Sequence, residues 1–170
     1  MQYGDYKVTK LIHHEPALQI FRCSGTDGGE YSLFCFDYSF PCSSPGLHVY
    51  TSFSACQRFC VVTDPVDMTL QQFYQKYSQQ KDYQRLCAQV IFDLLHDLMR
   101  DPLFTGFSPQ NVLLVYDPKA RKYMARLGIK MESDPAFKAP EAIASPEASV
   151  WGLGVTAFYL LTGKNPYLTR

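Results

Sequence analysis

The chain has no excess of charge of either sign and no long hydrophobic run. Sixteen basic residues balance sixteen acidic residues among its 170 residues, so no overall field favours binding to nucleic acid or to an anionic membrane. The most apolar stretch, from Val150 to Leu161, is shorter than the roughly 20 residues that a membrane-spanning helix needs. We therefore expect no nucleic-acid partner and no membrane.

The sequence also lacks a secretory signal and a metal-binding motif. The stretch from Met1 to Glu15 has no charged region followed by an apolar core, and it has no small-residue cleavage site. The six cysteines include no C-x-x-C pair, and Cys56 and Cys60 have no nearby pair of histidines. We expect reduced thiols in a cytoplasmic protein, with no bound metal.

What the sequence does have is apolar residues, 46% hydrophobic and 15% aromatic, as is typical of a folded globular protein. Before residue 64, short runs rich in aromatic and β-branched residues alternate with turn signals such as Gly28-Gly29. These runs are Tyr6 to Ile12, Gln19 to Ser24, Tyr31 to Asp37, Leu47 to Phe53 and Arg58 to Thr63. The pattern predicts a five-stranded antiparallel sheet.

After Asp64 the pattern becomes helical. Thr69 is predicted to begin a short helix, with Gln72 as its partner in a capping box. A longer helix, from about Asp82 to Met99, has one apolar stripe at three- and four-residue spacing. The stripe contains Tyr83, Leu86, Val90, Ile91, Leu94, Leu95 and Leu98.

The last part of the chain predicts a hairpin and a buried helix. Val112 to Tyr116 and Lys122 to Leu127 flank a turn that contains a proline, which is typical of a hairpin. Ser145 followed by Pro146 is typical of a helix start, and Gly163 is placed to end that helix.

Three motifs follow one another in the second half of the chain. Pro109-Gln110-Asn111 follows the long helix, Ala139-Pro140-Glu141 follows the hairpin, and Val150 to Tyr167 forms the apolar helix and its end. Together they resemble the eukaryotic protein kinase-like superfamily. The resemblance implies an α+β, two-lobed fold, with a β-rich N-lobe over residues 1–64 and a helical C-lobe over residues 65–170. If Ala139-Pro140-Glu141 did not pack beside the apolar helix, an unrelated α+β adaptor would be the better interpretation.

Two structural parts of the family have no counterpart in this sequence. Only nine residues lie between Asp37 and Leu47, with no helical pattern, where the resemblance would place the regulatory helix. The sequence ends just after the central helix, before the family's later helices. We therefore expect an antiparallel N-lobe that lacks the regulatory helix and a minimal, C-terminally truncated C-lobe.

The parts that hold nucleotide phosphates in kinases are missing as well. Kinases use a glycine-rich loop over the phosphates and a strand lysine paired with a helix glutamate. The segment at the position of the loop, Leu11 to Ala17, contains no glycine, and the strand from Tyr31 to Asp37 contains no basic residue. The hydrophobic framework of the family is kept while its charged parts are lost.

The residues that would carry the chemistry are also changed. Aligned on Pro109 and Asn111, the sequence has Gly106 in place of the base aspartate and Ser108 in place of the loop lysine. Arg126 takes the place of the aspartate of D-F-G, where a guanidinium would repel a metal ion. Asn111 matches the metal-binding asparagine, but one neutral amide cannot hold magnesium. The resemblance therefore implies a degraded pseudokinase with no catalytic residue, no cofactor and no enzyme activity.

Asn111 and Arg126 each leave two roles open. Asn111 is a relic ligand or, as we favour, a brace that bonds to the loop backbone. Arg126 binds a phosphate or a partner carboxylate, or it forms an internal ion pair. The alternative function is therefore a kinase-like protein that binds nucleotide, or retains phosphotransfer, without the usual metal ligands.

Histidine and cysteine residues offer weaker candidates. His13 and His14 are adjacent on a predicted strand, so their side chains point to opposite faces and do not converge on one metal. Cys87 and His96 could form a nucleophile pair, but nothing supplies an oxyanion hole or an orienting third group. We expect no cysteine catalysis.

One aromatic series suggests where a partner binds. Phe34, Phe36, Tyr38 and Phe40 alternate along a strand, so they share a face that either binds a partner or lies under a loop such as Phe40 to Pro45. We predict a catalytically inactive pseudokinase that acts as a protein-binding scaffold or as an allosteric subunit. Its protein partner would be an active kinase, a second copy of the chain or a multi-subunit complex.

Overall fold

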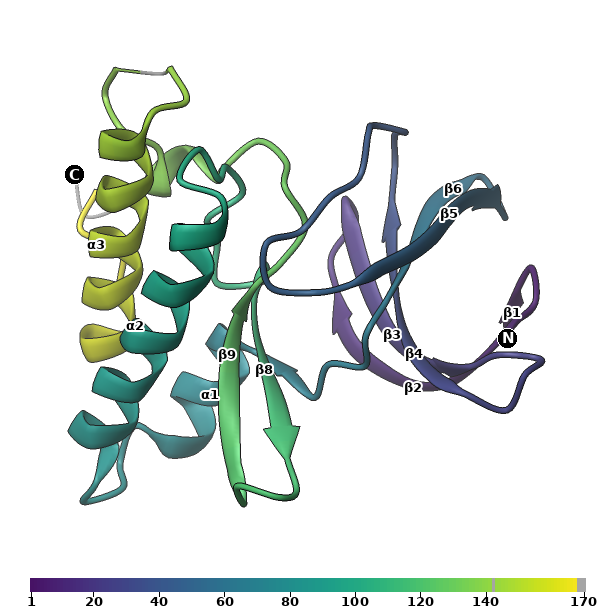
Figure 1. Ribbon diagram of the computed structural model, residues 1–170, viewed down its shortest axis with the longest axis horizontal. Helices are drawn as coiled ribbons and strands as arrows, with labels where there is room; N and C mark the ends of the chain where they lie inside the picture. The colour runs from purple at the N-terminus through teal and green to yellow at the C-terminus, as the bar shows by residue number, and fades with distance from the viewer. Residues whose placement is uncertain (142, 168–170) are drawn as a thin grey trace.

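The computed structural model describes residues 1–141 and 143–167, which form two lobes (Figure 1). The N-terminal lobe is a six-stranded antiparallel sheet with the order β1-β2-β3-β4-β6-β5. Its strands are β1 (Gln2–Tyr3), β2 (Tyr6–His14), β3 (Leu18–Ser24), β4 (Glu30–Phe36), β5 (Val49–Ala55) and β6 (Arg58–Thr63). All five predicted strands are present. The sixth, β1, is missed because a strand of two residues has no periodicity to detect.

The C-terminal lobe packs helices beside a small antiparallel sheet with the order β7-β8-β9. Its elements are β7 (Met68–Thr69), α1 (Leu70–Tyr77), α2 (Tyr83–Arg100), β8 (Val112–Asp117), β9 (Lys122–Leu127), the 3-10 helix η1 (Pro135–Phe137) and α3 (Pro146–Thr162). The predicted hairpin is β8 and β9, and Asp117 stabilises its turn by accepting bonds from the backbone N–H groups of Lys119 and Ala120.

The predicted helix ends are confirmed because capping depends on local bonds. Thr69 and Gln72 form the capping box of α1, in which each side chain bonds to the other residue's backbone N–H. The Ser145 side chain accepts a bond from Ala148 N–H at the start of α3. Gly163 ends α3 with a left-handed φ of 69°, a conformation that favours glycine.

The buried face of α2 agrees with most of the predicted stripe. Tyr83, Val90, Leu94 and Leu98 lie in the core of the C-terminal lobe, but the prediction for Leu95 is wrong, because its side chain is 47% exposed. The apolar stripe predicted from the sequence covers a wider arc of the helix than the part of α2 that contacts neighbouring elements. The other buried side of α2 carries two carboxylates, Asp93 and Asp97.

The connection between β4 and β5 covers the sheet face at which a partner site is predicted. Phe34 and Phe36 are 0% and 2% exposed, and Phe40 packs on Phe36 with ring centroids 4.9 Å apart. Leu47 joins the same apolar cluster, so the connection supplies the cover. An exposed partner-binding face at Phe34 and Phe36 is therefore contradicted, and of the four predicted residues only Tyr38 is exposed, at 57%.

Residues 37–48 contain no helix, so this cover is a loop. Figure 1 shows the loop reaching from the sheet toward the C-terminal lobe. The Ser43 carbonyl accepts a bond from Lys130 N–H at 2.8 Å, and the Ser44 hydroxyl donates to the Leu127 carbonyl at 3.1 Å. The loop therefore fastens the sheet to the segment that follows β9.

Candidate functional site

Asn111 lies at the centre of the loop that joins α2 to β8. Its amide nitrogen donates to the carbonyls of Gly106 at 2.9 Å and Ile129 at 2.8 Å, and its oxygen accepts a bond from Ile129 N–H at 3.0 Å. The side chain is completely buried. Both donor hydrogens are used within the protein, so these contacts agree with the favoured role of Asn111 as a brace.

Two glycines make this brace sterically feasible. Gly106 has φ = 119°, and a Cβ there would lie 2.8 Å from the Ile129 carbonyl and 2.9 Å from the Asn111 amide nitrogen. A Cβ at Gly128 would collide with the Asn111 side chain. The glycine at the position of the catalytic base is therefore required by the conformation and packing of this loop.

Serine hydroxyls satisfy further backbone groups of the same loop. Ser108 Oγ accepts a bond from Asn111 N–H at 3.1 Å. Ser133 Oγ lies on the neighbouring segment and accepts bonds from Gly106 N–H at 2.8 Å and Phe107 N–H at 3.1 Å. The loop is thus held by neutral hydrogen bonds at positions where the resemblance would place charged groups.

Arg126 forms the internal ion pair that was one of its two open roles. Its guanidinium lies 3.3 Å from the carboxylate of Asp97, which is completely buried. The second oxygen of Asp97 accepts a bond from Leu127 N–H at 3.0 Å. Burial raises the pKa of Asp97, although the bond from Leu127 and the nearby Arg126 both act to lower it.

Asp93 makes an equivalent contact one helical turn earlier. It accepts a bond from Ala125 N–H at 3.0 Å, so Asp93 and Asp97 together hold β9 against α2. The sequence analysis missed both residues. The available signal was a pair of carboxylates four residues apart on the helix, next to the apolar residues Leu94 and Leu98.

Apolar side chains from both lobes meet in one buried cluster. Leu113 and Ile129 from the C-terminal lobe belong to one buried cluster with sheet residues such as Ile12 and Phe34. The Gln72 side chain also donates a bond to the Ile12 carbonyl, which joins the start of α1 to β2. A nucleotide that entered this cluster would have to displace its packing.

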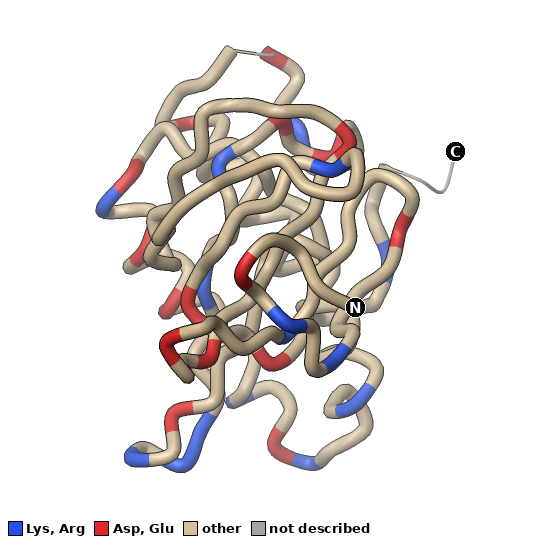
Figure 2. Tube along the Cα trace, turned by 90° about the vertical axis from the view of Figure 1, so that its right-hand side faces the viewer, with Lys and Arg blue, Asp and Glu red and all other residues tan. Residues whose placement is uncertain are grey.

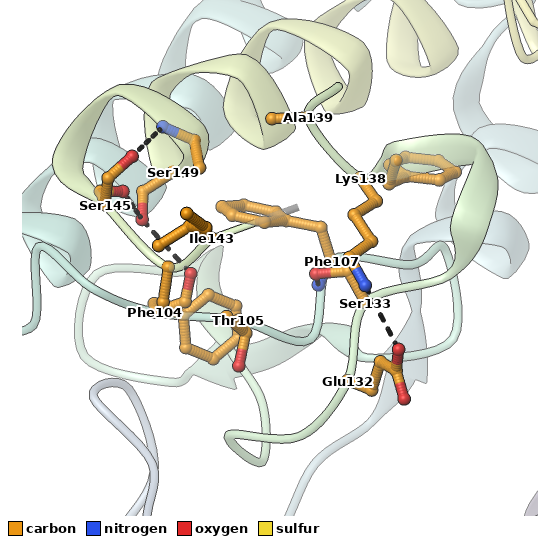
Figure 3. A pocket seen from close by; sticks show the side chains of 13 residues that line it. Phe104, Thr105, Phe107, Glu132, Ser133, Lys138, Ala139, Ile143, Ser145 and Ser149 are labelled. Carbon is orange, nitrogen blue, oxygen red and sulfur yellow. Dashed lines mark hydrogen bonds and ion pairs between the residues drawn. The ribbon is translucent and has the colours of Figure 1, made fainter. Parts of the chain in front are cut away.

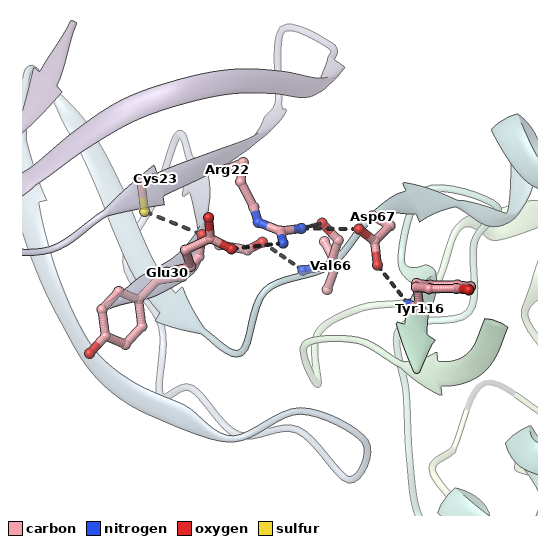
Figure 4. A network of polar contacts seen from close by, with 8 residues as sticks. Arg22, Cys23, Glu30, Val66, Asp67 and Tyr116 are labelled. Carbon is pink, nitrogen blue, oxygen red and sulfur yellow. Dashed lines mark hydrogen bonds and ion pairs between the residues drawn. The ribbon is translucent and has the colours of Figure 1, made fainter. Parts of the chain in front are cut away.

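The segment that connects the lobes is also bonded internally (Figure 4). Arg22 on β3 donates to the Val66 carbonyl at 2.9 Å and pairs with the Asp67 carboxylate at 3.2 Å. Val66 N–H donates to Ser32 Oγ at 2.8 Å, and Asp67 accepts a bond from Tyr116 N–H at 2.6 Å. The N–H and the carbonyl oxygen of Val66 each therefore make a bond within the protein, and the N–H is not free to bind the base of a nucleotide.

A cavity of about 250 Å³ lies beside the loop, between residues 104–107, residues 132–139 and the start of α3 (Figure 3). Phe104, Phe107 and Phe137 form much of its wall, and an ion pair between Lys138 and Glu132 at 3.1 Å lies at its side. The Ser133 and Ser149 hydroxyls are bonded to backbone groups. The cavity suits an apolar group and offers no obvious catalytic pair.

An exposed apolar surface lies on the outer helices of the C-terminal lobe. Phe92, Leu95 and Met99 on α2 are exposed, and so are Val150 and Leu161 on α3. In Figure 1 these two helices form the edge of the molecule that lies farthest from the large sheet. Leu95 and the stretch from Val150 to Leu161 were predicted from the sequence to be buried, because the same apolar pattern is expected of a helix buried on all sides.

The histidine and cysteine candidates from the sequence do not come together in one site. His13 Nε2 lies 3.3 Å from the Glu15 carboxylate, whereas His14 Nδ1 is 2.8 Å from the Gln19 amide. Burial lowers the pKa of His13, with Glu15 opposing that shift. Cys87 is buried in the apolar core of the C-terminal lobe.

Charge distribution, possible metal ligands and hydropathy add three findings. Acidic and basic residues are interspersed along the chain in Figure 2. Within residues 1–141 and 143–167, no three His, Cys, Asp or Glu side chains are grouped so that they could hold a metal ion. No helix in the part of the chain that the structure describes has the length and apolarity to cross a membrane.

The segment with Ala139-Pro140-Glu141 lies beside α3, as the kinase-like interpretation requires. Ala139 is buried, and the Phe137 ring packs near Tyr159 of α3 with centroids 6.4 Å apart. Asn165, just after α3, donates to the Ala136 carbonyl at 3.2 Å. These contacts remove the ground on which an unrelated adaptor would be favoured.

Comparison with known proteins identifies the fold. No protein-family model matches the sequence, and no curated protein matches it. Among solved structures, the chain is similar to the PknI kinase domain of Mycobacterium tuberculosis, crystallised as a double mutant, with a TM-score of 0.67 and 17% identity. The match covers 98% of this chain and 78% of that chain. The protein therefore has an α+β, two-lobed protein kinase-like fold.

Proposed function

We propose that this kinase-like protein does not transfer phosphoryl groups and instead binds other proteins, as a scaffold or as an allosteric subunit of a larger assembly. The observation that carries the proposal is the contact of Gly106 with Asn111 and Ile129. At the position of the catalytic base the backbone adopts φ = 119° and leaves no room for a Cβ. The conformation of this loop therefore requires a residue without a side chain at position 106.

The other groups near this loop are committed to internal bonds. Phosphoryl transfer depends on positioned charges and metal ions that stabilise the transferred group. The amide oxygen of Asn111, the atom that would bind Mg²⁺, accepts a bond from Ile129 N–H, and its amide hydrogens go to backbone carbonyls. Arg126 pairs with Asp97, so binding a phosphate there would compete with the ion pair that joins β9 to α2.

Nucleotide binding without metal ligands is the competing function, and a titration tests it. With about 10 mM ATP, a dissociation constant of about 1 mM would stabilise the protein by roughly 1.4 kcal/mol. For a protein of this size that corresponds to roughly 3–6 °C in melting temperature. We expect no shift, with or without Mg²⁺, and no phosphate transfer to a generic protein substrate.

A shift of several degrees would overturn the claim that nucleotide is not bound. Arg126→Ala would then identify the site, because loss of the shift would show that Arg126 leaves Asp97 to hold a phosphate. Measured transfer of phosphate by the purified protein would overturn the whole proposal.

Protein binding is supported by the exposed apolar side chains of α2 and α3. Exposed apolar surface that is contiguous commonly marks a site of protein association. Phe92 and Met99, on the same helix, are 66% and 74% exposed. We expect Phe92→Glu to abolish co-purification of a stoichiometric partner, while Leu11→Glu on the sheet keeps it. If both variants keep the partner, the surface on α2 is not the binding site.

A further inference from the structure

Two cysteines of the large sheet face each other across neighbouring strands. Cys35 on β4 and Cys60 on β6 are register partners in an antiparallel pair, and both are free thiols. Their Sγ atoms lie 3.5 Å apart and share a hydrogen bond. Register partners on antiparallel strands have Cα atoms about 4.5–5.5 Å apart, which lies within the range of about 4.4–6.8 Å found in disulfides. The two thiols therefore have the backbone separation that a disulfide needs.

Both thiols lie in one apolar cluster of the sheet and are 0% exposed. A buried cysteine commonly acts as a small apolar side chain, but that role does not require two sulfurs in direct contact. Cys23 belongs to the same cluster, yet its register partner is Tyr31, and its thiol donates to the Tyr31 carbonyl at 3.6 Å. Cys60, and not Cys23, is the thiol that Cys35 contacts.

The two thiols differ in their tendency to ionise. The bond from Cys35 lowers the pKa of Cys60, and the nearby Arg58 acts in the same direction, while burial opposes both. The bond to Cys60 raises the pKa of Cys35, and burial adds to that rise. Since the thiolate is the nucleophile in thiol oxidation, Cys60 is the thiol that reacts first.

The strand beside Cys60 lies at the edge of the sheet. β5 is the last strand in the sheet order, and none of its residues is buried. Phe53 on β5 is the register partner of Cys60 on this side, and it packs against the cluster that contains both thiols. A strand with few buried contacts opens locally at a low cost in free energy. Opening of β5 moves Phe53 away and lets a small oxidant reach Cys60.

We propose that Cys35 and Cys60 form a dithiol that hydrogen peroxide converts to a disulfide between β4 and β6. The Cys60 thiolate attacks one peroxide oxygen and the O–O bond breaks, which gives a sulfenic acid. The other oxygen leaves as hydroxide, which takes up the proton that Cys60 lost and becomes water. The sulfur of Cys35 then attacks the sulfenic sulfur, the S–O bond breaks, and the hydroxyl leaves with the proton of Cys35 as a second water. The two thiols lose two electrons, and one peroxide gains them.

The disulfide would restrain the hairpin of β5 and β6. It closes a ring that contains β5 and the loop of residues 37–48, which bonds to Lys130 and Leu127 in the C-terminal lobe. With β6 linked to β4, the hairpin could no longer separate from the rest of the sheet. The inference goes beyond the proposed function and does not depend on it, because the residues of the cluster around the thiols all precede Asp64.

Peptide mapping of the reduced full chain after treatment with hydrogen peroxide tests the proposal. The peroxide is removed, the remaining thiols are alkylated as the chain is unfolded, and the peptides are analysed by mass spectrometry without reduction. We expect a peptide pair linked through Cys35 and Cys60. Cys87, which is buried in the other lobe, is the internal control and should remain an alkylated thiol. Alkylation of Cys35 and Cys60 to the same extent as in the untreated chain would overturn the inference, and so would a link from either of them to Cys23.

Serine variants test the order of the two steps. In Cys35→Ser the resolving thiol is missing, so a cyclic diketone that reacts with sulfenic acids should label Cys60. In Cys60→Ser the same reagent should leave Cys35 unlabelled. Cys56→Ser, at an exposed cysteine in the turn between β5 and β6, is the matched control and should keep the disulfide. Labelling of Cys35 in place of Cys60 would overturn the assigned order. If the serine variants do not fold, the linked peptide of the parent chain still decides the pairing.

Hydrogen exchange measures the restraint. Amides of β5 and β6 should exchange at least severalfold more slowly in the oxidised chain than in the reduced chain, because the hairpin must now open with β6 still linked to β4. Equal exchange in the two forms would overturn the proposed restraint. Absence of the disulfide leaves the proposed function untouched, whereas phosphate transfer by the purified chain would remove the proposed function and leave the disulfide standing.

Discussion

Two loops of this protein differ in how they are stabilised at positions where the resemblance to kinases would place functional parts. The loop of residues 104–111 keeps its backbone path, held by Asn111, but has no charged side chain at the position of the base. The loop of residues 37–48 stands where a regulatory helix would lie and keeps only the apolar cover of the sheet. The first loop has a fixed backbone path but no charged side chain at the position of the base. The second loop buries the sheet face but does not form a helix.

The difference shows which interaction stabilises each loop, hydrogen bonds in residues 104–111 and apolar burial in residues 37–48. A loop that lies against β8 and β9 must satisfy buried backbone groups, so its path is fixed by hydrogen bonds. A cover over Phe34 and Phe36 needs only apolar side chains at the right distance, so a helix can be exchanged for a loop. Variants of each loop should therefore lose stability for different reasons.

The largest effect is expected from Asn111→Ala. The substitution leaves the Gly106 and Ile129 carbonyls and the Ile129 N–H without partners in a buried site. We expect a loss of roughly 3–5 kcal/mol in the free energy of unfolding, since each buried unsatisfied group costs about 1–3 kcal/mol. Urea denaturation measures it. Gln110→Ala, next in the chain, should change the stability by less than about 0.5 kcal/mol. A loss below about 1 kcal/mol for Asn111→Ala would show that water or another group replaces the brace.

A smaller effect is expected from Gly106→Ala, compared with Gly28→Ala. Both glycines have positive φ, but a Cβ at Gly28 meets nothing within 4 Å, whereas one at Gly106 meets the Ile129 carbonyl at 2.8 Å. Strain alone should cost about 1–2 kcal/mol at Gly28, and strain with overpacking roughly 2–4 kcal/mol at Gly106. Thermal denaturation of both variants measures the difference. Equal losses would mean that the contact with Ile129 does not constrain the loop.

The second loop should respond less, as Ser44→Ala is expected to show. Ser44 Oγ accepts bonds from Gly46 N–H at 3.3 Å and Leu47 N–H at 2.9 Å and donates to the Leu127 carbonyl. We expect a loss of about 1 kcal/mol and faster hydrogen exchange at Leu47, with the core strands unaffected. Ser43→Ala is the control, because its exposed side chain can be removed while its carbonyl still bonds to Lys130. If exchange at β4 also accelerates, the loop is part of the core rather than a cover.

The smallest effect is a pH dependence at Asp97. Because burial raises its folded pKa above the usual value near about 3.9, the folded protein holds the proton more tightly than the unfolded chain. The contribution of Asp97 to the free energy of unfolding is therefore complete at pH values below the unfolded pKa. It is lost as the pH rises through the folded pKa. The advantage of the parent chain over Asp97→Asn should shrink in urea denaturation as the pH rises above the unfolded pKa and through the raised folded pKa.

Arg126→Ala sharpens this test. The Arg126 guanidinium lowers the pKa of Asp97, so its removal should move the loss of stability to higher pH. An advantage of the parent chain over Asp97→Asn that grows with pH would contradict the assigned direction.

Much of the fold could be predicted because its signals are local. The caps at Thr69 and Ser145 depend on residues within one turn, and the strands of the large sheet carry their own alternation. β1 and β7, with two residues each, carry no pattern of their own. The prediction for Leu95 failed because periodicity gives the direction of a side chain and not how far the neighbouring element extends.

The contacts of the candidate site were harder to predict because their partners are distant in sequence. Asp97 bonds to Leu127 on another element, and the loop of residues 37–48 reaches Lys130 across the molecule. A sequence pattern marks Phe34 and Phe36 as sharing a face but does not say which segment covers it. Gly106 was identified as a lost aspartate, whereas its positive φ became visible only in the structure.

The side chain of Gln72 bonds both to the start of α1 and to β2 of the large sheet. Its oxygen holds Thr69 N–H in the first turn of α1, while its nitrogen holds the Ile12 carbonyl on β2. A hinge movement that draws the sheet away from the helices must therefore break a bond to Gln72, the residue whose oxygen also caps the start of α1. Opening of the lobes and fraying of that helix become one cooperative event, so the two halves of this protein should respond to a bound partner as a single body.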